Sequence, residues 1–172
     1  EKTDAKKNTD IAIKVLGTFN MYGGNITGNS ASSGAGVSVS GTFNMYGGSI
    51  TKNMARNDMN GTGIGLGGGV RVGGGTFNMF DGKITENTGE KGGGVYVASG
   101  TFNMEGGTIS SNTAARNSAT TESTTEFYGG GVYVKSGTFN MTGGTIADNT
   151  ADGNGAGVYI DNTQYNTFNM SG

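Results

Sequence analysis

One four-residue phrase, Thr-Phe-Asn-Met, recurs six times and limits what this chain can fold into. The copies occupy residues 18–21, 42–45, 76–79, 101–104, 138–141 and 167–170. Alternate residues of a strand point to opposite sides, so Phe and Met share one face while Thr and Asn share the other. This alternation predicts strands with one buried face. Successive Phe residues are 24, 34, 25, 37 and 29 positions apart, and self-similarity at such a period indicates a repeat architecture.

Two further segments recur around this phrase. A Val-x-Val-like segment precedes each copy and contains the pairs Ile13/Val15, Val37/Val39, Val70/Val72, Val95/Val97, Val132/Val134 and Val158/Ile160. An isolated Ile follows the first five copies, at positions 26, 50, 84, 109 and 146. Three short strands per repeat predict an all-β solenoid, because each unit buries its apolar side only when its neighbours stack on it.

An Asn lies three residues after each of these Ile residues, at positions 29, 53, 87, 112 and 149. Stacking of equivalent residues would place these side chains above one another at a bend. We therefore predict an internal ladder in which each amide bonds to its copies, since buried polar groups need partners. The same stacking predicts a surface ion pair between Lys52 and Glu86, worth less than about 1 kcal/mol.

Residues 94–109 and 131–146, Gly-Val-Tyr-Val-x-Ser-Gly-Thr-Phe-Asn-Met-x-Gly-Gly-Thr-Ile, resemble repeats of right-handed parallel β-helices. They resemble in particular the repeats of adhesin-like surface proteins of bacteria and archaea. The resemblance implies a right-handed parallel β-helix of about six coils over residues 11–172, with residues 1–10 as an N-terminal linker or partial coil. No polar capping element follows the sixth copy, so we expect the chain to be part of a longer protein.

The longer repeats carry their extra residues between the bend Asn and the next Val-x-Val, in residues 54–69 and 113–131. A solenoid places both long loops on one edge, where insertions often bind partners. Apolar residues in them, including Met59, Phe127 and Tyr128, either cover the barrel wall or contact a ligand.

The residue content excludes several kinds of site. The chain has no His and no Cys, which removes the usual nucleophile–base pairs and His- or Cys-based zinc sites. Its 11 basic residues are scattered, so we expect no nucleic-acid partner, and no apolar run is long enough to span a membrane. We expect no cofactor, although a calcium ion at Asn57–Asp58 or at residues 148–152 stays open.

Two columns of aromatic residues are candidates for binding. Tyr96, Tyr133 and Tyr159 occupy the middle position of Val-x-Val, and Tyr22, Tyr46 and Phe80 directly follow Met. Both columns are expected to point outward, where exposed aromatic patches often mark interfaces. The other interpretation is that their stacking stabilises the sheet.

The outward Thr and Asn residues of the phrase form two regular ranks, similar to the Thr ranks of ice-binding β-solenoids. The candidate ice-binding face contains Thr42, Asn44, Thr76, Asn78, Thr101, Asn103, Thr138 and Asn140.

We expect a non-catalytic extracellular or cell-surface module, a rigid stalk or adhesin segment with a glycan or protein partner. End-to-end stacking with itself or with neighbouring repeats is a further expectation. The alternatives are an ice-binding solenoid and a polysaccharide-active enzyme that uses Glu105 or Asp81.

Overall fold

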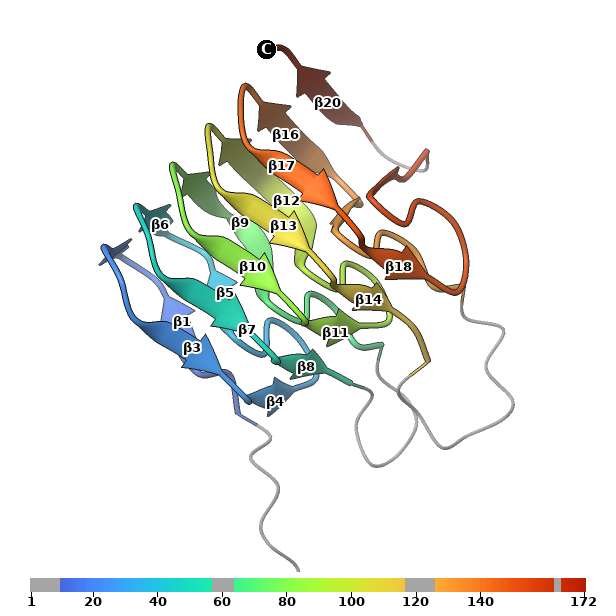
Figure 1. Ribbon diagram of the computed structural model, residues 1–172, viewed down its shortest axis with the longest axis horizontal. Coiled ribbons are helices and arrows are strands. Elements are labelled where there is room, and N and C mark those ends of the chain that lie inside the picture. Colours follow the sequence, from blue (N-terminus) through green and yellow to red (C-terminus); the bar gives the residue numbers. More distant parts are fainter. Residues whose placement is uncertain (1–9, 57–63, 117–125, 163–164) are drawn as a thin grey trace, which may run out of the picture.

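The computed structural model describes residues 10–56, 64–116, 126–162 and 165–172, which form strands and turns with no helix. Most of the expected linker, residues 1–9, lies outside the described residues, as do Asn57, Asp58 and Met59. The strands pair in parallel within one ten-stranded and two five-stranded sheets. Equivalent strands follow one another in sequence order, from β1 and β3 at the lower left of Figure 1 to β20 at its top. This all-β architecture of stacked parallel sheets is consistent with a β-solenoid.

The ten-stranded sheet combines the Val-x-Val and the Thr-Phe-Asn-Met segments. Its Val-x-Val strands are β1 (Ile13–Val15), β5 (Val37–Val39), β15 (Val132–Val134) and β19 (Val158–Ile160). Its Thr-Phe-Asn-Met strands are β2 (Thr18–Met21), β6 (Thr42–Met45), β16 (Gly137–Met141) and β20 (Asn166–Met170). In β9 (Val70–Met79) and β12 (Val95–Met104) the two segments run together as one strand.

The first five-stranded sheet contains the Ile segments. It consists of β3 (Asn25–Thr27), β7 (Ser49–Thr51), β10 (Lys83–Thr85), β13 (Thr108–Ser110) and β17 (Thr145–Ala147). The second five-stranded sheet consists of two-residue strands that directly follow the bend Asn residues. They are β4 (Ser30–Ala31), β8 (Met54–Ala55), β11 (Thr88–Gly89), β14 (Thr113–Ala114) and β18 (Thr150–Ala151). The prediction of three strands per repeat is therefore incomplete, because a fourth short strand lies beyond the bend.

Equivalent residues of the recurring segments pair with one another, although the register of β9 and β12 shifts at Ser99, between their two segments. Phe102 pairs with Phe77 on one side and Phe139 on the other, and Ile84 pairs with both Ile50 and Ile109. We call one set of equivalent strands a layer. Pairing without an offset puts every residue type into a column along the axis, as the sequence predicts.

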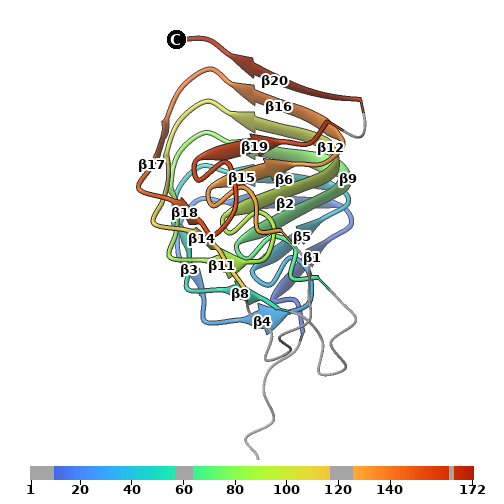
Figure 2. The ribbon, with the colours of Figure 1, turned by 90° about the vertical axis from the view of Figure 1, so that its right-hand side faces the viewer.

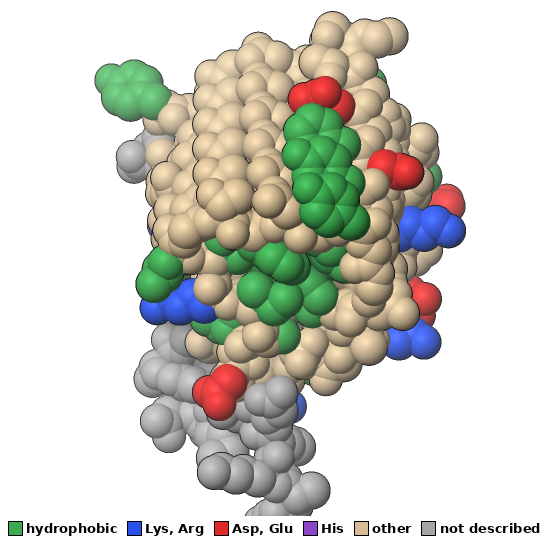
Figure 3. Space-filling model, turned by 90° about the vertical axis from the view of Figure 1, so that its left-hand side faces the viewer, with side chains coloured by type: hydrophobic (Ala, Val, Ile, Leu, Met, Phe, Trp, Pro, Cys, Tyr) green, Lys and Arg blue, Asp and Glu red, His purple; other side chains and the backbone are tan. Residues whose placement is uncertain are grey.

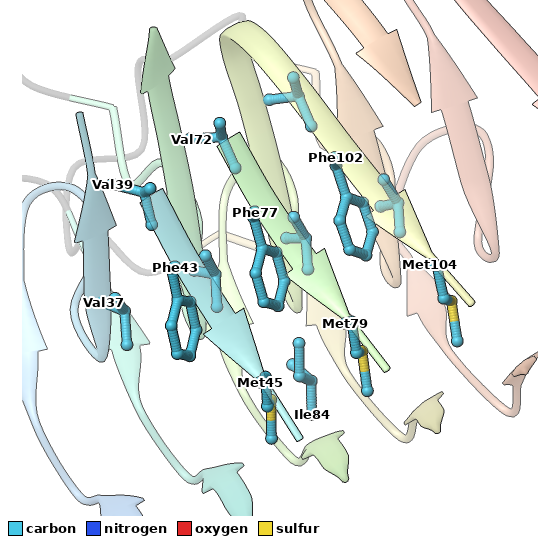
Figure 4. Packing of buried hydrophobic residues seen from close by; sticks show 14 of the residues in the cluster. Val37, Val39, Phe43, Met45, Val72, Phe77, Met79, Ile84, Phe102 and Met104 are labelled. Carbon is cyan, nitrogen blue, oxygen red and sulfur yellow. The ribbon is translucent and has the colours of Figure 1, made fainter. Parts of the chain in front are cut away.

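The apolar columns form the hydrophobic core. Figure 2 shows the stacked strands of the sheets that surround it. The six Phe rings stack at centroid separations between 4.7 and 5.0 Å. Figure 4 shows Phe43, Phe77 and Phe102 repeating in one orientation, with Met45, Met79 and Met104 beside them. Each stacked aromatic pair adds about 0.5–1.5 kcal/mol to the contribution of buried area alone. The predicted apolar columns are confirmed.

The Asn residues after the Ile strands form the predicted internal ladder. Asn53 donates from its side-chain Nδ2 to Asn87 Oδ1 at 3.0 Å and to the Ile26 carbonyl at 2.9 Å. Its own Oδ1 accepts from the backbone N and from Nδ2 of Asn29, at 3.1 and 2.9 Å. Asn87 and Asn112 repeat this pattern. Two donors and two acceptor sites per amide are thereby satisfied, which allows Asn87 and Asn112 to be fully buried.

The residue before each ladder Asn has left-handed backbone geometry. Lys52, Glu86, Ser111 and Asp148 have φ angles of 54–56°, and Gly28 occupies the equivalent position. This conformation costs a non-glycine residue about 1 kcal/mol or more, so surrounding hydrogen bonds must keep the residue in it. The ladder bonds of the following Asn provide that restraint. On the outside of the same corner, Lys52 Nζ and Glu86 Oε2 are 3.7 Å apart, which confirms the predicted exposed ion pair.

The glycine at the turn after Met is required by close packing. Gly107 has φ of 80°, and a Cβ at this position would lie 2.6 Å from the terminal methyl group of Met79 and 2.7 Å from the Gly82 carbonyl. The Met column therefore fills the space against these turns. This explains why a Gly lies three residues after each of the first five Met residues of the phrase, at positions 24, 48, 82, 107 and 144.

We expect Asn87→Ala to lower the free energy of unfolding by about 3 kcal/mol or more. The substitution leaves the buried backbone N–H and side-chain Nδ2 of Asn53 and the carbonyl of Ile50 without these hydrogen-bond partners. The measurement is urea denaturation. Asn78→Ala in the same repeat is the matched control. Asn78 bonds to Asn44 and Asn103 on the half-exposed outer face, where water can replace the lost partners. The free energy of unfolding of this variant should therefore fall by less than about 1 kcal/mol. Equal losses for the two variants would contradict the internal role of the Asn87 ladder.

Candidate functional site

The outer face of the Thr-Phe-Asn-Met strands carries three parallel columns. The first two are the Thr and Asn of the phrase. The third, which we call the post-Met column, consists of Tyr22, Tyr46, Phe80, Glu105, Thr142 and Ser171. From Tyr46 onward, the backbone N–H of each post-Met residue donates to the Met carbonyl of the preceding layer, at 2.8–3.0 Å. The backbone of the column is thus regular, although its side chains change from aromatic to short and polar.

The Asn column forms a second, external ladder. Asn44 Nδ2 donates to Asn20 Oδ1 at 2.8 Å, and the same bond joins each later pair up to Asn169, at 2.8 or 2.9 Å. Each of these bonds uses one of the two N–H groups of an amide and one of its two acceptor positions. The remaining N–H groups and lone pairs provide hydrogen-bonding capacity along the exposed side of the sheet.

The predicted ice-binding ranks are in register on this face. Thr42, Thr76, Thr101 and Thr138 are half-buried and aligned by strand pairing. The neighbouring amides of Asn44, Asn78, Asn103 and Asn140 bond to one another in the external ladder. Ice binding itself stays a prediction.

The aromatic part of the post-Met column lies on the surface as the sequence predicts. Tyr22 and Tyr46 stack at 5.0 Å, and Tyr46 and Phe80 stack at 4.8 Å. Tyr22 is 75% exposed and Tyr46 is 41% exposed. Figure 3 shows a narrow column of hydrophobic side chains on a largely uncharged surface, with acidic groups beside it. Because stacking covers both faces of Tyr46, this residue offers a ligand its ring edge and hydroxyl group.

A shallow groove of about 330 Å³ continues this face where the post-Met column becomes short and polar. It is lined by Asn103, Glu105, Asn140, Thr142, Asn169 and Ser171. The sequence patterns described above do not predict this groove. The signal was present, because the residue after Met changes from an aromatic ring to Glu, Thr and Ser in the last three repeats.

The Tyr column of the Val-x-Val strands is covered, in contrast to the expectation of an exposed stripe. Tyr96 and Tyr133 are 3% and 1% exposed, and Tyr159 is half-buried. The three rings stack at 5.2 and 5.3 Å, and Tyr128 packs over Tyr133 and Tyr159. Tyr96 and Tyr133 leave the main core and stack as expected, but the prediction that they are exposed is wrong, because their rings form a second small core with Tyr128.

The cover comes from the residues before the Gly-rich corners. Lys91 and Tyr128 pair through an isolated bridge, and Lys91 Nζ lies 5.6 Å from the ring centroids of both Tyr128 and Tyr133. Tyr128 is 9% exposed and its hydroxyl donates to Glu126. Phe127 is half-buried, with the Arg116 guanidinium 5.7 Å from its ring centroid. For these two loop residues, the structure agrees with the interpretation that apolar loop residues cover the wall.

Burial raises the pKa of Tyr96 to about 12, with Arg71 opposing the shift and Asp161 adding to it. Burial also raises the pKa of Tyr133 far above the usual tyrosine value. The hydrogen bond that the Tyr133 hydroxyl donates to Asp161 has the same effect, because ionisation would destroy it. Both hydroxyls are thus held in the protonated form, which suits packing rather than proton transfer.

Within the described residues, no group of three or more Asp, Glu, His or Cys side chains is placed to hold a metal ion. The alternative calcium position at Asn57–Asp58 lies outside them. Of the two carboxylates considered for catalysis, Glu105 lies in the groove, whereas Asp81 accepts a 2.7 Å hydrogen bond from the backbone of Gly82. No described helix is long and apolar enough to cross a membrane.

No protein-family model matches the chain, and comparisons with curated proteins and with solved structures give no match either. The class of protein therefore follows from the architecture alone. It is an all-β repeat protein of stacked parallel strands with an amide ladder inside and another outside.

We expect the free energy of unfolding to fall by about 1 kcal/mol more in the wild type than in Tyr96→Phe when the pH rises from about 9 to about 11. The unfolded Tyr96 ionises near pH 10.0, whereas the folded residue keeps its proton to about pH 12. Alkaline pH therefore favours the unfolded chain. Denaturation at the two pH values measures the difference, and the exposed Tyr22→Phe is the control. Equal losses in all three proteins would contradict a buried, protonated Tyr96.

Proposed function

We propose that this chain is a rigid, non-catalytic module of an extracellular surface protein, and that its outer Thr/Asn face makes the contacts. The observation that carries the proposal is the unbroken continuity of the columns. The buried Phe stack and both amide ladders run from layer to layer without a change in register. A body built in this way resists bending and presents the same groups at a regular spacing, which suits a stalk or an adhesive segment.

We further propose that the fold is a right-handed parallel β-helix of about six coils. Six Thr-Phe-Asn-Met segments paired in register support this number. The resemblance of residues 94–109 and 131–146 to adhesin-like repeats supports the handedness and the surface role.

The partner in this proposal is a glycan or a protein at a cell surface. The exposed stack of Tyr22, Tyr46 and Phe80 supports it, since such a patch stands out on a surface with few charges. End-to-end stacking is a related proposal. It is supported by Phe19 and Phe168, which are only partly buried at the two ends of the Phe column.

Two other functions stay as proposals. Ice binding is supported by the aligned Thr42, Thr76, Thr101 and Thr138. A polysaccharide-active enzyme is supported only by Glu105 in the groove, without a second carboxylate among the groove residues.

Antibodies raised against the recombinant chain should label intact cells of the source organism, and external protease should remove the label. The physical reason is that a stalk or adhesive segment must be accessible from outside. A cytosolic marker protein that stays protected under the same treatment is the control. Labelling only after permeabilisation would contradict the proposed surface role.

A further inference from the structure

The post-Met column is raised in its first three layers and hollow in its last three. The raised part, which we call the aromatic ridge, consists of Tyr22, Tyr46 and Phe80. The first two of these rings are 75% and 41% exposed. The hollow part is the groove of about 330 Å³, where the column contains Glu105, Thr142 and Ser171. The backbone hydrogen bonds to the preceding Met carbonyls continue through both parts, so the difference in height comes from the side chains.

The ridge and the groove change places when the molecule is turned end over end. Consider a two-fold axis that lies in this face, perpendicular to the axis of the stack and between the layers of Phe80 and Glu105. It reverses the order of the layers and keeps each column opposite its own counterpart. The first layer of one copy then faces the sixth of the other, the second faces the fifth, and the third faces the fourth. The ridge of each copy thus lies against the groove of the other, and both contacts form together, as in any isologous pair.

The ridge fits the groove in size and in spacing. A cavity of about 150 Å³ holds a benzene ring, so a groove of about 330 Å³ has room for two aromatic rings. The ring centroids of the ridge are 5.0 and 4.8 Å apart, and the strands of the groove pair in the same register as those of the ridge. Rings of one copy therefore stay aligned with the layers of the other along the whole contact.

The facing surfaces are almost free of charge. Glu105 is the only charged residue in the three outward columns. The two-fold axis places its carboxylate opposite the outward edge of the Phe80 ring, and an aromatic edge carries partial positive charge. The same axis brings the two Glu105 side chains to positions one layer apart on opposite copies, where they repel each other. This repulsion is the one electrostatic cost that these columns impose on pairing.

The Thr and Asn columns favour a partner with the same repeat. Each amide of the external ladder keeps one N–H and one acceptor position, and the axis puts the Asn column of one copy opposite that of the other. Layers spaced by 4.7–5.0 Å, judged from the Phe centroids, match layers of the same spacing. Three columns over six layers cover roughly 500 Å² on each copy, and the total of about 1,000 Å² lies at the lower limit for specific interfaces.

We propose that the outer face binds a second copy of this chain in antiparallel orientation, with the aromatic ridge of each copy in the groove of the other. The inference rests on the proposed function in taking the outer face as the contact surface, and it names the partner of that face. It differs from end-to-end stacking, because the two copies lie side by side and the ends of the Phe column take no part.

Sedimentation equilibrium of the whole chain tests the pairing. We expect a dimer with a Kd of about 1–100 µM, in keeping with the small area. Glu105→Gln should tighten the dimer about threefold, because it removes the repulsion across the axis. Met54→Ser is the control. It removes an exposed apolar side chain from β8 in another sheet, and its Kd should stay within about twofold of the wild type.

An exchange of side chains between the second and fifth layers tests the orientation. Thr142→Tyr fills the groove with a ring that meets Tyr46 of the other copy, and Tyr46→Thr leaves the groove opposite it unfilled. Each variant alone should therefore dimerise at least about tenfold more weakly than the wild type. An equimolar mixture should regain the wild-type affinity, because the introduced ring then faces the trimmed position while Tyr46 of one chain faces Thr142 of the other. Urea denaturation verifies that both variants are folded.

Crosslinking gives an independent measure of the orientation, since the chain has no Cys. Thr42→Cys and Thr138→Cys lie in the second and fifth layers. A short bifunctional thiol reagent should join the two variants when they are mixed and should join neither variant to itself, because two copies of one position are three layers apart. End-to-end stacking does not bring these two layers together either.

Three results would overturn the proposal. They are a wild type that stays monomeric at about 500 µM, exchange variants that stay monomeric when mixed, and efficient crosslinking of Thr42→Cys to itself, which indicates parallel pairing. A monomer that is labelled on intact cells contradicts only this inference. An antiparallel dimer of a protein that the antibodies reach only after permeabilisation contradicts only the proposed surface role.

Discussion

In-register pairing of each recurring segment with its equivalent in the next repeat is the constraint on which the rest of the structure depends. It places Phe on Phe and Met on Met, and it brings the buried amides of Asn53, Asn87 and Asn112 within hydrogen-bonding distance. A shift by one residue would turn the apolar face outward and break every ladder bond. Register, core and ladder therefore stabilise one another. The strained corners at Lys52, Glu86 and Ser111 are tolerated for the same reason.

Much of this arrangement could be predicted because the same short pattern recurs. The strand positions, the Phe and Met columns, the Asn ladder and the Lys52–Glu86 pair all follow from stacking equivalent residues. The two-residue strands such as β11 could not be predicted, since two residues carry no detectable alternation. Alternation also says only that Tyr96 and Tyr133 leave the core face of their sheet. It does not show that two residues across a Gly-rich corner cover these rings. These residues are Lys91 and Tyr128, which lie five residues before Tyr96 and Tyr133 respectively.

The candidate site arises from variation on a constant backbone. Among the three outward columns, Thr and Asn are the same in every repeat, and only the post-Met column differs from layer to layer. Its change from Phe80 to Glu105 ends an aromatic stack and begins a polar groove within one layer spacing. The sequence contained this change, but its meaning depends on knowing that consecutive repeats lie side by side in space. A fold of this kind can vary its surface at one position while leaving the core and the ladders intact.

Nuclear Overhauser contacts between aromatic rings in solution test the in-register stacking most directly. With selectively labelled Phe, the ring of Phe102 should show contacts to the rings of Phe77 and Phe139, 25 and 37 residues away in the sequence. The account predicts these contacts together with slow exchange of the Asn87 side-chain amide. A Phe102 ring in contact with water, or with rings other than those of the two adjacent layers, would contradict it.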